Sequence, residues 1–279
     1  MSAWSAWSAL AAHLPRPPQP PGERRGAVQD ACIVAGFCTL LALLVRIGDG
    51  YHAFFDALNA PWARVPDALA QTITYAGDTL PALALMLLAA RWRPGVVWLG
   101  TLAALVASLL SNALKLLVSA MRPAAVLPAA SFHLVGPAYH AHSFPSGHSI
   151  TAFATAATLG WWLPRGGRIA LYLVAAAIAW SRVGVGAHWP LDALGGAAIG
   201  CAAVLIAARV AQRWSWGERA RGHSVLLLAL ATCAVWLVLR APVYPLAAWP
   251  ARTLGVLALA EFGWGWRQNL RRPSQPTAT

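Results

Sequence analysis

The sequence predicts an all-α protein, a polytopic helical bundle that crosses a lipid bilayer. Hydrophobic residues make up 58% of its 279 residues and charged residues only 11%, whereas a soluble globular domain carries about 25% charged residues. The apolar residues are grouped in runs of roughly twenty, the length that a helix needs to cross the hydrocarbon core. The chain also contains 15 tryptophans, a residue type enriched at membrane–water interfaces.

Seven apolar runs are long enough to be membrane spans, and an eighth is marginal. The seven lie near residues 28–47, 72–90, 95–118, 148–164, 168–186, 191–211 and 223–241. The eighth, near 244–262, contains Pro250, Arg252 and Glu261, so it is either a span or an interfacial helix anchored by tryptophans. The sequence therefore predicts seven or eight spans.

The basic residues indicate the orientation of the bundle. There are 21 Lys+Arg against 9 Asp+Glu, but the basic residues cluster in short loops between apolar runs, which argues against a nucleic-acid partner. If these loops are cytoplasmic, segments 49–71, 119–147 and 183–190 lie on the outer face. Residues 1–26, with a Ser-Ala-Trp repeat and a proline cluster, are expected to form a disordered cytosolic tail.

The first group of candidate functional residues is a pair of cations near the end of the third run. Lys115 and Arg122 are seven residues apart, or two helical turns, so both are expected to project from one helix face, and Pro123 cannot continue the helix. Two cations on one face favour an anionic ligand. A single Lys or Arg near a span end, however, more commonly extends to lipid headgroups.

The second group is Pro145-Ser146-Gly147-His148, directly before an apolar run. Ser146 can cap the helix, Gly147 lets the backbone approach a ligand, and the first N–H groups with the helix dipole favour a phosphate. His148 can then donate a proton. The same tetrapeptide is equally compatible with an ordinary capped helix that starts with an interfacial histidine.

The third group is Arg182, His188 and Asp192. His188 and Asp192 are four residues apart at the start of the sixth run, so the carboxylate can contact the imidazole, with Pro190 tolerated in the first turn. An Asp that binds one ring nitrogen fixes the tautomer and leaves the other nitrogen as a nucleophile or base. Such a pair can also be purely structural, but the neighbouring Arg182 at a membrane surface favours catalysis.

Together, Lys-x6-Arg-Pro, Pro-Ser-Gly-His and Ser-Arg-x5-His-x3-Asp resemble the signature of the type 2 phosphatidic acid phosphatase superfamily, and all three parts are intact. The resemblance covers residues 28–212 and implies a six-helix membrane core whose site lies on the outer face in bacteria. We therefore expect a phosphatase domain at 27–212, followed at 213–279 by one or two extra membrane helices and a tail.

The resemblance also implies a role for each residue. His188 would attack phosphorus, Asp192 would orient His188, and His148 would protonate the leaving oxygen. The residues that would hold the phosphoryl oxygens are Lys115, Arg122, Ser146, Gly147 and Arg182.

No metal or other cofactor is expected. The chain has only 9 acidic residues, without the paired carboxylates or histidine clusters that Mg²⁺ or Zn²⁺ requires. The resemblance likewise implies metal-independent hydrolysis through a phosphohistidine.

The expected substrate is a phosphorylated lipid, since a site at the outer surface of a bacterial inner (plasma) membrane meets amphiphiles whose tails stay in hydrocarbon. Family members act on undecaprenyl pyrophosphate, phosphatidylglycerophosphate, phosphatidic acid or the phosphates of lipid A, and we favour the first. Two alternatives stay open at this point. One is a phosphotransferase with the same His188 intermediate, and the other is a non-enzymatic transporter of anionic lipids, which would need the cations but not the His188–Asp192 pair.

Overall fold

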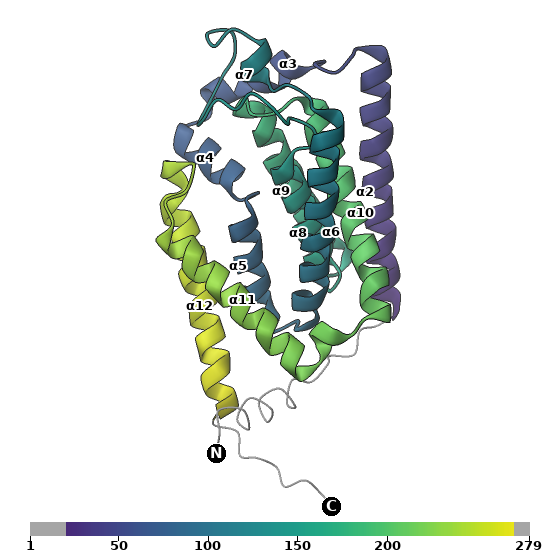
Figure 1. Ribbon diagram of the computed structural model, residues 1–279, viewed down its shortest axis with the longest axis vertical. Helices are drawn as coiled ribbons and strands as arrows, with labels where there is room; N and C mark the ends of the chain where they lie inside the picture. Colours follow the sequence, from purple (N-terminus) through teal and green to yellow (C-terminus); the bar gives the residue numbers. More distant parts are fainter. Residues whose placement is uncertain (1–20, 271–279) are drawn as a thin grey trace, which may run out of the picture.

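The computed structural model describes residues 21–270, and all regular secondary structure in this range is helical. The predicted all-α fold class is therefore confirmed. In chain order the elements are α2 (Pro21–Gly48), α3 (Phe55–Asn59), η1 (Ala60–Arg64), α4 (Asp67–Tyr75), α5 (Thr79–Ala90), α6 (Gly95–Val118), α7 (Pro123–Val126), α8 (Gly147–Gly160), α9 (Arg165–Gly184), α10 (Pro190–Arg213), η2 (Trp216–Glu218), α11 (Ala220–Leu239), η3 (Pro245–Ala247) and α12 (Ala248–Leu270). The long helices run side by side (Figure 1).

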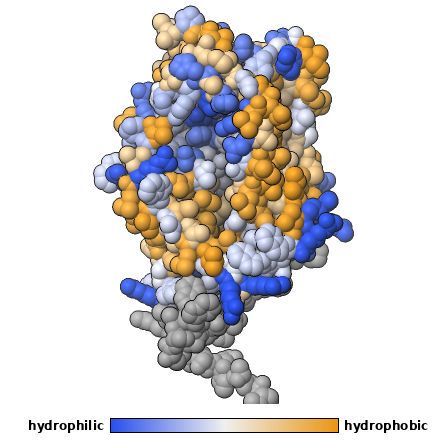
Figure 2. Space-filling view, viewed as in Figure 1, coloured by the Kyte–Doolittle hydropathy of each residue, from blue (hydrophilic) through white to orange (hydrophobic). Residues whose placement is uncertain are grey.

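Within residues 21–270, four helical segments are long and apolar enough to cross a membrane alone: Arg24–Gly48, Gly95–Val126, Pro190–Arg213 and Ala220–Leu239. Helices α4 and α5 satisfy the same test as a pair, bent by 64°. Helix α8 has 14 residues, which extend only about 21 Å, so seven or eight full spans stay a prediction. Figure 2 shows hydrophobic side chains along much of the length of the visible helices, as a lipid-facing surface requires.

The apolar run at 72–90 is not one continuous helix. It breaks between α4 and α5 at Gly77, where a Cβ atom would lie 2.6 Å from Cγ2 of Ile178 and 3.0 Å from Cβ of His148. Only a glycine permits this approach to α8 and α9. Helix α5 then restarts with Asp78 as its cap, which accepts a hydrogen bond from the Leu80 N–H at 3.1 Å.

The amino-terminal boundary also differs from the prediction. Helix α2 begins at Pro21, so residues 21–26, which were expected to belong to a disordered tail, are helical. The rest of the predicted tail, residues 1–20, lies outside the described residues.

Helix α10 forms the centre of the bundle and packs against α2, α6 and α8. Gly196 and Gly200, one turn apart, let its backbone approach α8 closely. A Cβ atom at Gly196 would lie 2.6 Å from the Ser146 carbonyl oxygen, and one at Gly200 would lie 2.5 Å from the Ile150 carbonyl oxygen. This pair of small residues fixes the start of α8 against the start of α10.

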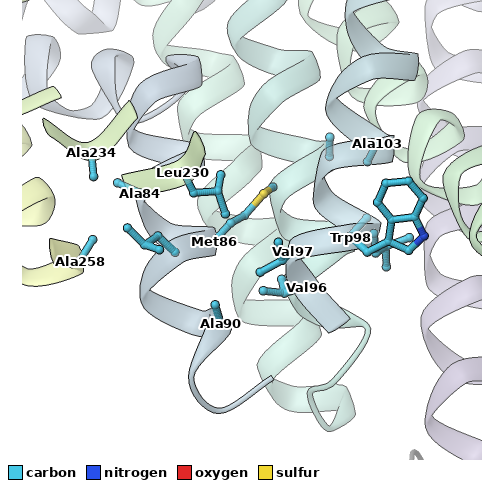
Figure 3. Close-up of a cluster of buried hydrophobic side chains, with 14 of the residues drawn as sticks. Ala84, Met86, Ala90, Val96, Val97, Trp98, Ala103, Leu230, Ala234 and Ala258 are labelled. Atoms are coloured by element: carbon cyan, nitrogen blue, oxygen red, sulfur yellow. The ribbon is translucent and has the colours of Figure 1, made fainter. Parts of the chain in front are cut away.

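The carboxy-terminal helices share a core with the rest of the bundle. Helices α11 and α12 pack against each other and against α5, and Figure 3 shows Leu230 of α11 close to Met86 of α5 and Val97 of α6. Arg91, directly after α5, also pairs with Glu261 of α12. Helices α11 and α12 are therefore part of the same packed unit as residues 27–212.

Three connecting segments meet at the end of the bundle that carries the short helices α3 and α7, at the top of Figure 1. They are residues 49–66, 119–146 and 185–189, which connect successive long helices. Hydrogen bonds between residues of these segments, such as Val135 N–H to the Val185 carbonyl at 3.2 Å, join them directly. The three candidate groups found in the sequence are thus brought together at one end.

Candidate active site

His188 lies in the turn between α9 and α10, and its side chain is only 2% exposed. Its Nδ1 atom is 3.3 Å from Oδ2 of Asp192, which lies in the first turn of α10 behind Pro190 at position N1. The four-residue spacing therefore produces the contact that the sequence predicted. The proline costs no helical hydrogen bond at this position, because the first N–H groups of a helix have no partner within it.

The Asp192 carboxylate is held by donors that the sequence analysis missed. Tyr51 donates to Oδ1, while Ser143 and the backbone N–H of Trp189 donate to Oδ2, the latter at 2.9 Å. With both oxygens occupied, the carboxylate cannot rotate away from His188. Ser143 stands just before the Pro-Ser-Gly-His motif and could have been suspected on that ground, but no local signal distinguishes Tyr51.

Arg122 reaches the other side of the His188 ring. Its Nη1 lies 3.2 Å from Nε2 of His188 and donates to the Ala187 carbonyl at 3.0 Å. A guanidinium group can only donate hydrogen bonds, so Nε2 is the acceptor and the ring proton is on Nδ1, facing Asp192. His188 is therefore held in the tautomer whose lone pair on Nε2 points toward a cationic group.

The helical arrangement expected for Lys115 and Arg122 is wrong. Helix α6 ends at Val118, and Ser119 follows with a left-handed φ of 46°, so the two cations are not on one helix face. Arg122 instead lies in extended backbone before α7, and its Nε donates to the Ala141 carbonyl at 2.9 Å. The spacing of seven residues suggested two helical turns, but the helix ends and the chain changes direction between Lys115 and Arg122.

Helix α8 begins as predicted, with Ser146 as its cap. The Ser146 Oγ accepts a hydrogen bond from the Ser149 N–H at 3.3 Å, which leaves the N–H groups of Gly147 and His148 at the mouth of the helix. The Lys115 ammonium lies 4.0 Å from where a Cβ atom would stand on Gly147. A cation and a helix N-terminus thus face the same small volume, which favours an anion there.

Arg182 is buried near the end of α9, with 2% of its surface exposed. Its Nη1 donates to two hydroxyl oxygens, those of Thr74 and, at 2.9 Å, Tyr244. Its Nε atom is buried and has no partner among the described residues. A buried donor without a partner costs free energy unless a ligand satisfies it, and the sequence analysis identified neither hydroxyl.

Burial lowers the pKa of His188 to about 4, with the positive charge of Arg122 acting in the same direction and the Asp192 hydrogen bond opposing both. Burial and the nearby Asp192 raise the pKa of Tyr51. The imidazole is therefore neutral at physiological pH, while the Tyr51 phenol stays protonated and continues to donate. A neutral imidazole with a fixed tautomer beside several cations can act as a nucleophile toward an anionic electrophile.

Comparisons with known proteins agree with this geometry. The model of the PAP2 superfamily matches residues 95–216, a range that contains all eight predicted site residues. The crystal structure of Aquifex aeolicus LpxE superposes with a TM-score of 0.52 at 30% sequence identity, covering 56% of this chain and 93% of that one.

Two curated proteins are similar over shorter stretches. The putative undecaprenyl-diphosphatase YbjG of Escherichia coli (strain K12) is 45% identical over 62 residues, 21% of this chain and 31% of that protein. The undecaprenyl-diphosphatase of Sulfolobus acidocaldarius is 31% identical over 127 residues, 43% of this chain and 57% of that protein. The chain thus spans about a third of the length of the first relative and a little over half of the length of the second.

The structural match extends over nearly the whole of Aquifex LpxE, and the family model coincides with the segment that supplies the candidate site. This protein therefore belongs to the PAP2 superfamily, the type 2 phosphatidic acid phosphatases.

Proposed function

We propose that this protein is a membrane lipid phosphatase that hydrolyses a phosphomonoester or pyrophosphate of a lipid through a covalent phosphohistidine on His188. The observation that carries the proposal is the position of the His188 ring, with Nδ1 on the buried Asp192 carboxylate and Nε2 facing Arg122. A structural Asp–His pair would have no need of a cation at the second nitrogen, whereas a nucleophile that attacks a phosphoryl group does.

In the proposed reaction, Nε2 of His188 attacks phosphorus and the bond from phosphorus to the leaving oxygen breaks. His148, whose protonated form is favoured by the negative charge of a bound phosphoryl group, gives its proton to that oxygen. His148 then takes a proton from water, whose oxygen attacks phosphorus and breaks the nitrogen–phosphorus bond to release inorganic phosphate. Asp192 holds the Nδ1 proton throughout and stabilises the positive charge that the ring carries in the intermediate.

The phosphoryl oxygens would be bound by Lys115, Arg122, Arg182 and the N-terminus of α8, which Ser146 caps and Gly147 opens. Phosphoryl transfer depends mainly on positioning and on neutralising the charge of the transferred group. Three cations and a helix N-terminus supply that neutralisation from the chain itself, so the proposed steps need no metal ion.

A cavity of about 290 Å³ extends from Gly147 and His148 into the bundle between α5, α6 and α8. At the site end its walls include Ser111 and Asn112, and deeper they are small and apolar, including Ala103 and Met86. A polar mouth that leads to an apolar interior fits an amphiphile whose phosphate is at the cations and whose tail lies among hydrocarbon side chains. This shape supports a lipid rather than a soluble phosphate ester as the substrate.

We favour undecaprenyl pyrophosphate as the lipid, because one curated relative is named an undecaprenyl-diphosphatase and the other a putative undecaprenyl-diphosphatase. Phosphatidylglycerophosphate and the phosphates of lipid A are the alternatives. We also propose that the protein resides in the bacterial inner membrane with its site facing the periplasm or exterior, since the arginine-rich turns at the opposite end would be retained in the cytoplasm.

The decisive experiment measures phosphate release from a panel of purified lipid phosphates and pyrophosphates in detergent, with His188→Ala as the matched inactive variant. We expect wild-type protein to release inorganic phosphate from at least one lipid supplied alone, and His188→Ala to release none while retaining its thermal unfolding midpoint. Turnover only when a second lipid acceptor is added would indicate a phosphotransferase. Binding without turnover of any lipid would indicate a transporter, and full activity of His188→Ala would refute the mechanism.

A further inference from the structure

Tyr244, in the connection between α11 and α12, extends into the candidate site although it is far from every motif in the sequence. It directly precedes η3 and is 3% exposed. Its hydroxyl oxygen accepts a hydrogen bond from Nη1 of Arg182 at 2.9 Å, and the Arg182 guanidinium carbon is 5.7 Å from the centroid of its ring. The contact joins the carboxy-terminal helices to the phosphate-binding group.

The Tyr244 side chain is fixed from two sides. The Leu246 N–H donates to Oε1 of Gln71 in α4 at 3.0 Å, which anchors η3 to the bundle. Gly136, with a φ of +89°, lies directly against the ring, since a Cβ atom there would be 2.6 Å from Cε1 of Tyr244. A ring held in this way presents its hydroxyl at one position, which a freely rotating side chain would not do.

The contact with Tyr244 orients the Arg182 side chain and leaves its positive charge unchanged. The oxygens on Nη1 belong to two neutral hydroxyl groups, those of Thr74 and Tyr244, so they orient the guanidinium without neutralising its charge. A carboxylate in the same place would form an ion pair and reduce the attraction of Arg182 for an anion. The Nε atom is buried and has no hydrogen-bond partner among residues 21–270, so the donor capacity of Arg182 is not exhausted by protein groups.

We infer that Tyr244 is a positioning residue of the phosphate site, which acts through Arg182, and that the α11–α12 connection thereby contributes to a site whose eight sequence-predicted residues all lie within residues 95–216. The inference rests on the proposed function for the identity of the ligand, a phosphoryl group. It gives residues beyond 216, where the family match ends, a role in phosphate binding.

The test is Tyr244→Phe, which removes the hydroxyl but keeps the ring against Gly136. A hydrogen bond to a charged group is worth roughly a tenfold change or more in affinity. We therefore expect the KM for the lipid phosphate and the inhibition constant of inorganic phosphate both to rise about tenfold, with a smaller change in kcat and an unchanged thermal unfolding midpoint.

The matched control is Tyr75→Phe, the same chemical change at another tyrosine buried in the same hydrophobic cluster. It should leave both constants unaltered. Equal effects of the two substitutions, or normal phosphate inhibition in Tyr244→Phe, would overturn the inference.

A second readout keeps this test separate from the test of the proposed function. Inorganic phosphate that binds the folded protein raises its unfolding midpoint, and this rise can be measured even if no lipid is turned over. We expect Tyr244→Phe to require about tenfold more phosphate than wild type for the same rise. An unchanged requirement would contradict the role of Tyr244 alone, whereas a wild-type protein that hydrolyses no lipid would contradict the proposed function alone.

Discussion

The hydroxyl of Tyr51 donates a hydrogen bond to Oδ1 of Asp192, joining residues 141 positions apart in the sequence. Tyr51 belongs to the segment after α2, and the neighbouring His52 ring stacks on Trp189 with 3.9 Å between centroids. The turn that carries His188 is therefore braced by a segment that contains none of the recognised motifs.

The first prediction concerns this brace. Tyr51→Phe should lower kcat about tenfold, because loss of one hydrogen bond to a charged group lets the carboxylate reorient relative to His188. KM should change little, since Tyr51 contacts none of the cations assigned to phosphate binding. Steady-state kinetics on the best lipid substrate provide the measurement, with His52→Ala as a comparison that removes the stacking but not the hydrogen bond. A rise in KM at constant kcat would contradict this assignment.

The second prediction is the pH dependence. In the proposed mechanism His188 attacks only when neutral, and its pKa is lowered to about 4. Activity that depends on this group is therefore present above about pH 4 and lost as the pH falls through that value. The acidic limb of the kcat/KM profile should lie well below the ordinary histidine value of about 6.5.

The Arg122 charge contributes to that lowered pKa, although burial is the larger cause. Arg122→Gln should therefore move the acidic limb upward in pH as well as weakening phosphate binding. The pH profile of kcat/KM in the two proteins tests both effects, and an identical limb would show that the guanidinium does not act on the His188 ring.

The third prediction concerns the cavity between α5, α6 and α8. Ala104 lines it, whereas the next residue, Leu105, is 61% exposed on the outer surface of α6. Ala104→Phe should fill part of the cavity and reduce kcat/KM for a long-chain lipid phosphate at least tenfold. Leu105→Phe should have little effect. Hydrolysis of a short, water-soluble phosphate ester should be similar in both variants, and a loss there would mean that Ala104→Phe damages the phosphate site itself.

The fourth prediction concerns divalent metal ions. In the proposed mechanism three cationic side chains and the α8 N-terminus neutralise the transferred group, so chelation should leave at least about half of the initial rate. The measurement is phosphate release before and after dialysis against a chelator, followed by addition of Mg²⁺. Loss of activity that Mg²⁺ restores would contradict the proposed steps.

The sequence predicted much of this arrangement because the decisive signals are local. Apolar run length predicted the long helices, Ser146 was recognised as a cap from its position before a run, and the spacing of four between His188 and Asp192 predicted their contact. Each of these depends on helical geometry over a few residues.

What the sequence did not predict depends on tertiary contacts. The run at 72–90 does contain a local sign of the break that was overlooked, since Gly77 is followed by the capping Asp78 and by Pro81, but the close approach of His148 and Ile178 to Gly77 comes from other helices. The contacts of Tyr51, Thr74 and Tyr244 are likewise made with residues distant in the sequence. The partners of Tyr51 and Thr74 are more than a hundred positions away, and the partner of Tyr244 is more than sixty positions away. Arg122 was expected to be helical because it lies seven residues after Lys115, but this spacing places two residues on one helix face only where the helix continues between them.

The glycine contact between α10 and α8 has a consequence for how the enzyme would behave in different bilayers. Membranes that thin or thicken change the tilt of the helices they contain, which would move groups carried on separate helices. Here His188 precedes α10 and His148 begins α8, and the backbones of these helices touch at Gly196 and Gly200 with no room for a side chain. We therefore expect the separation of the two histidines to change little with bilayer thickness, even where the tilt of the outer helices changes.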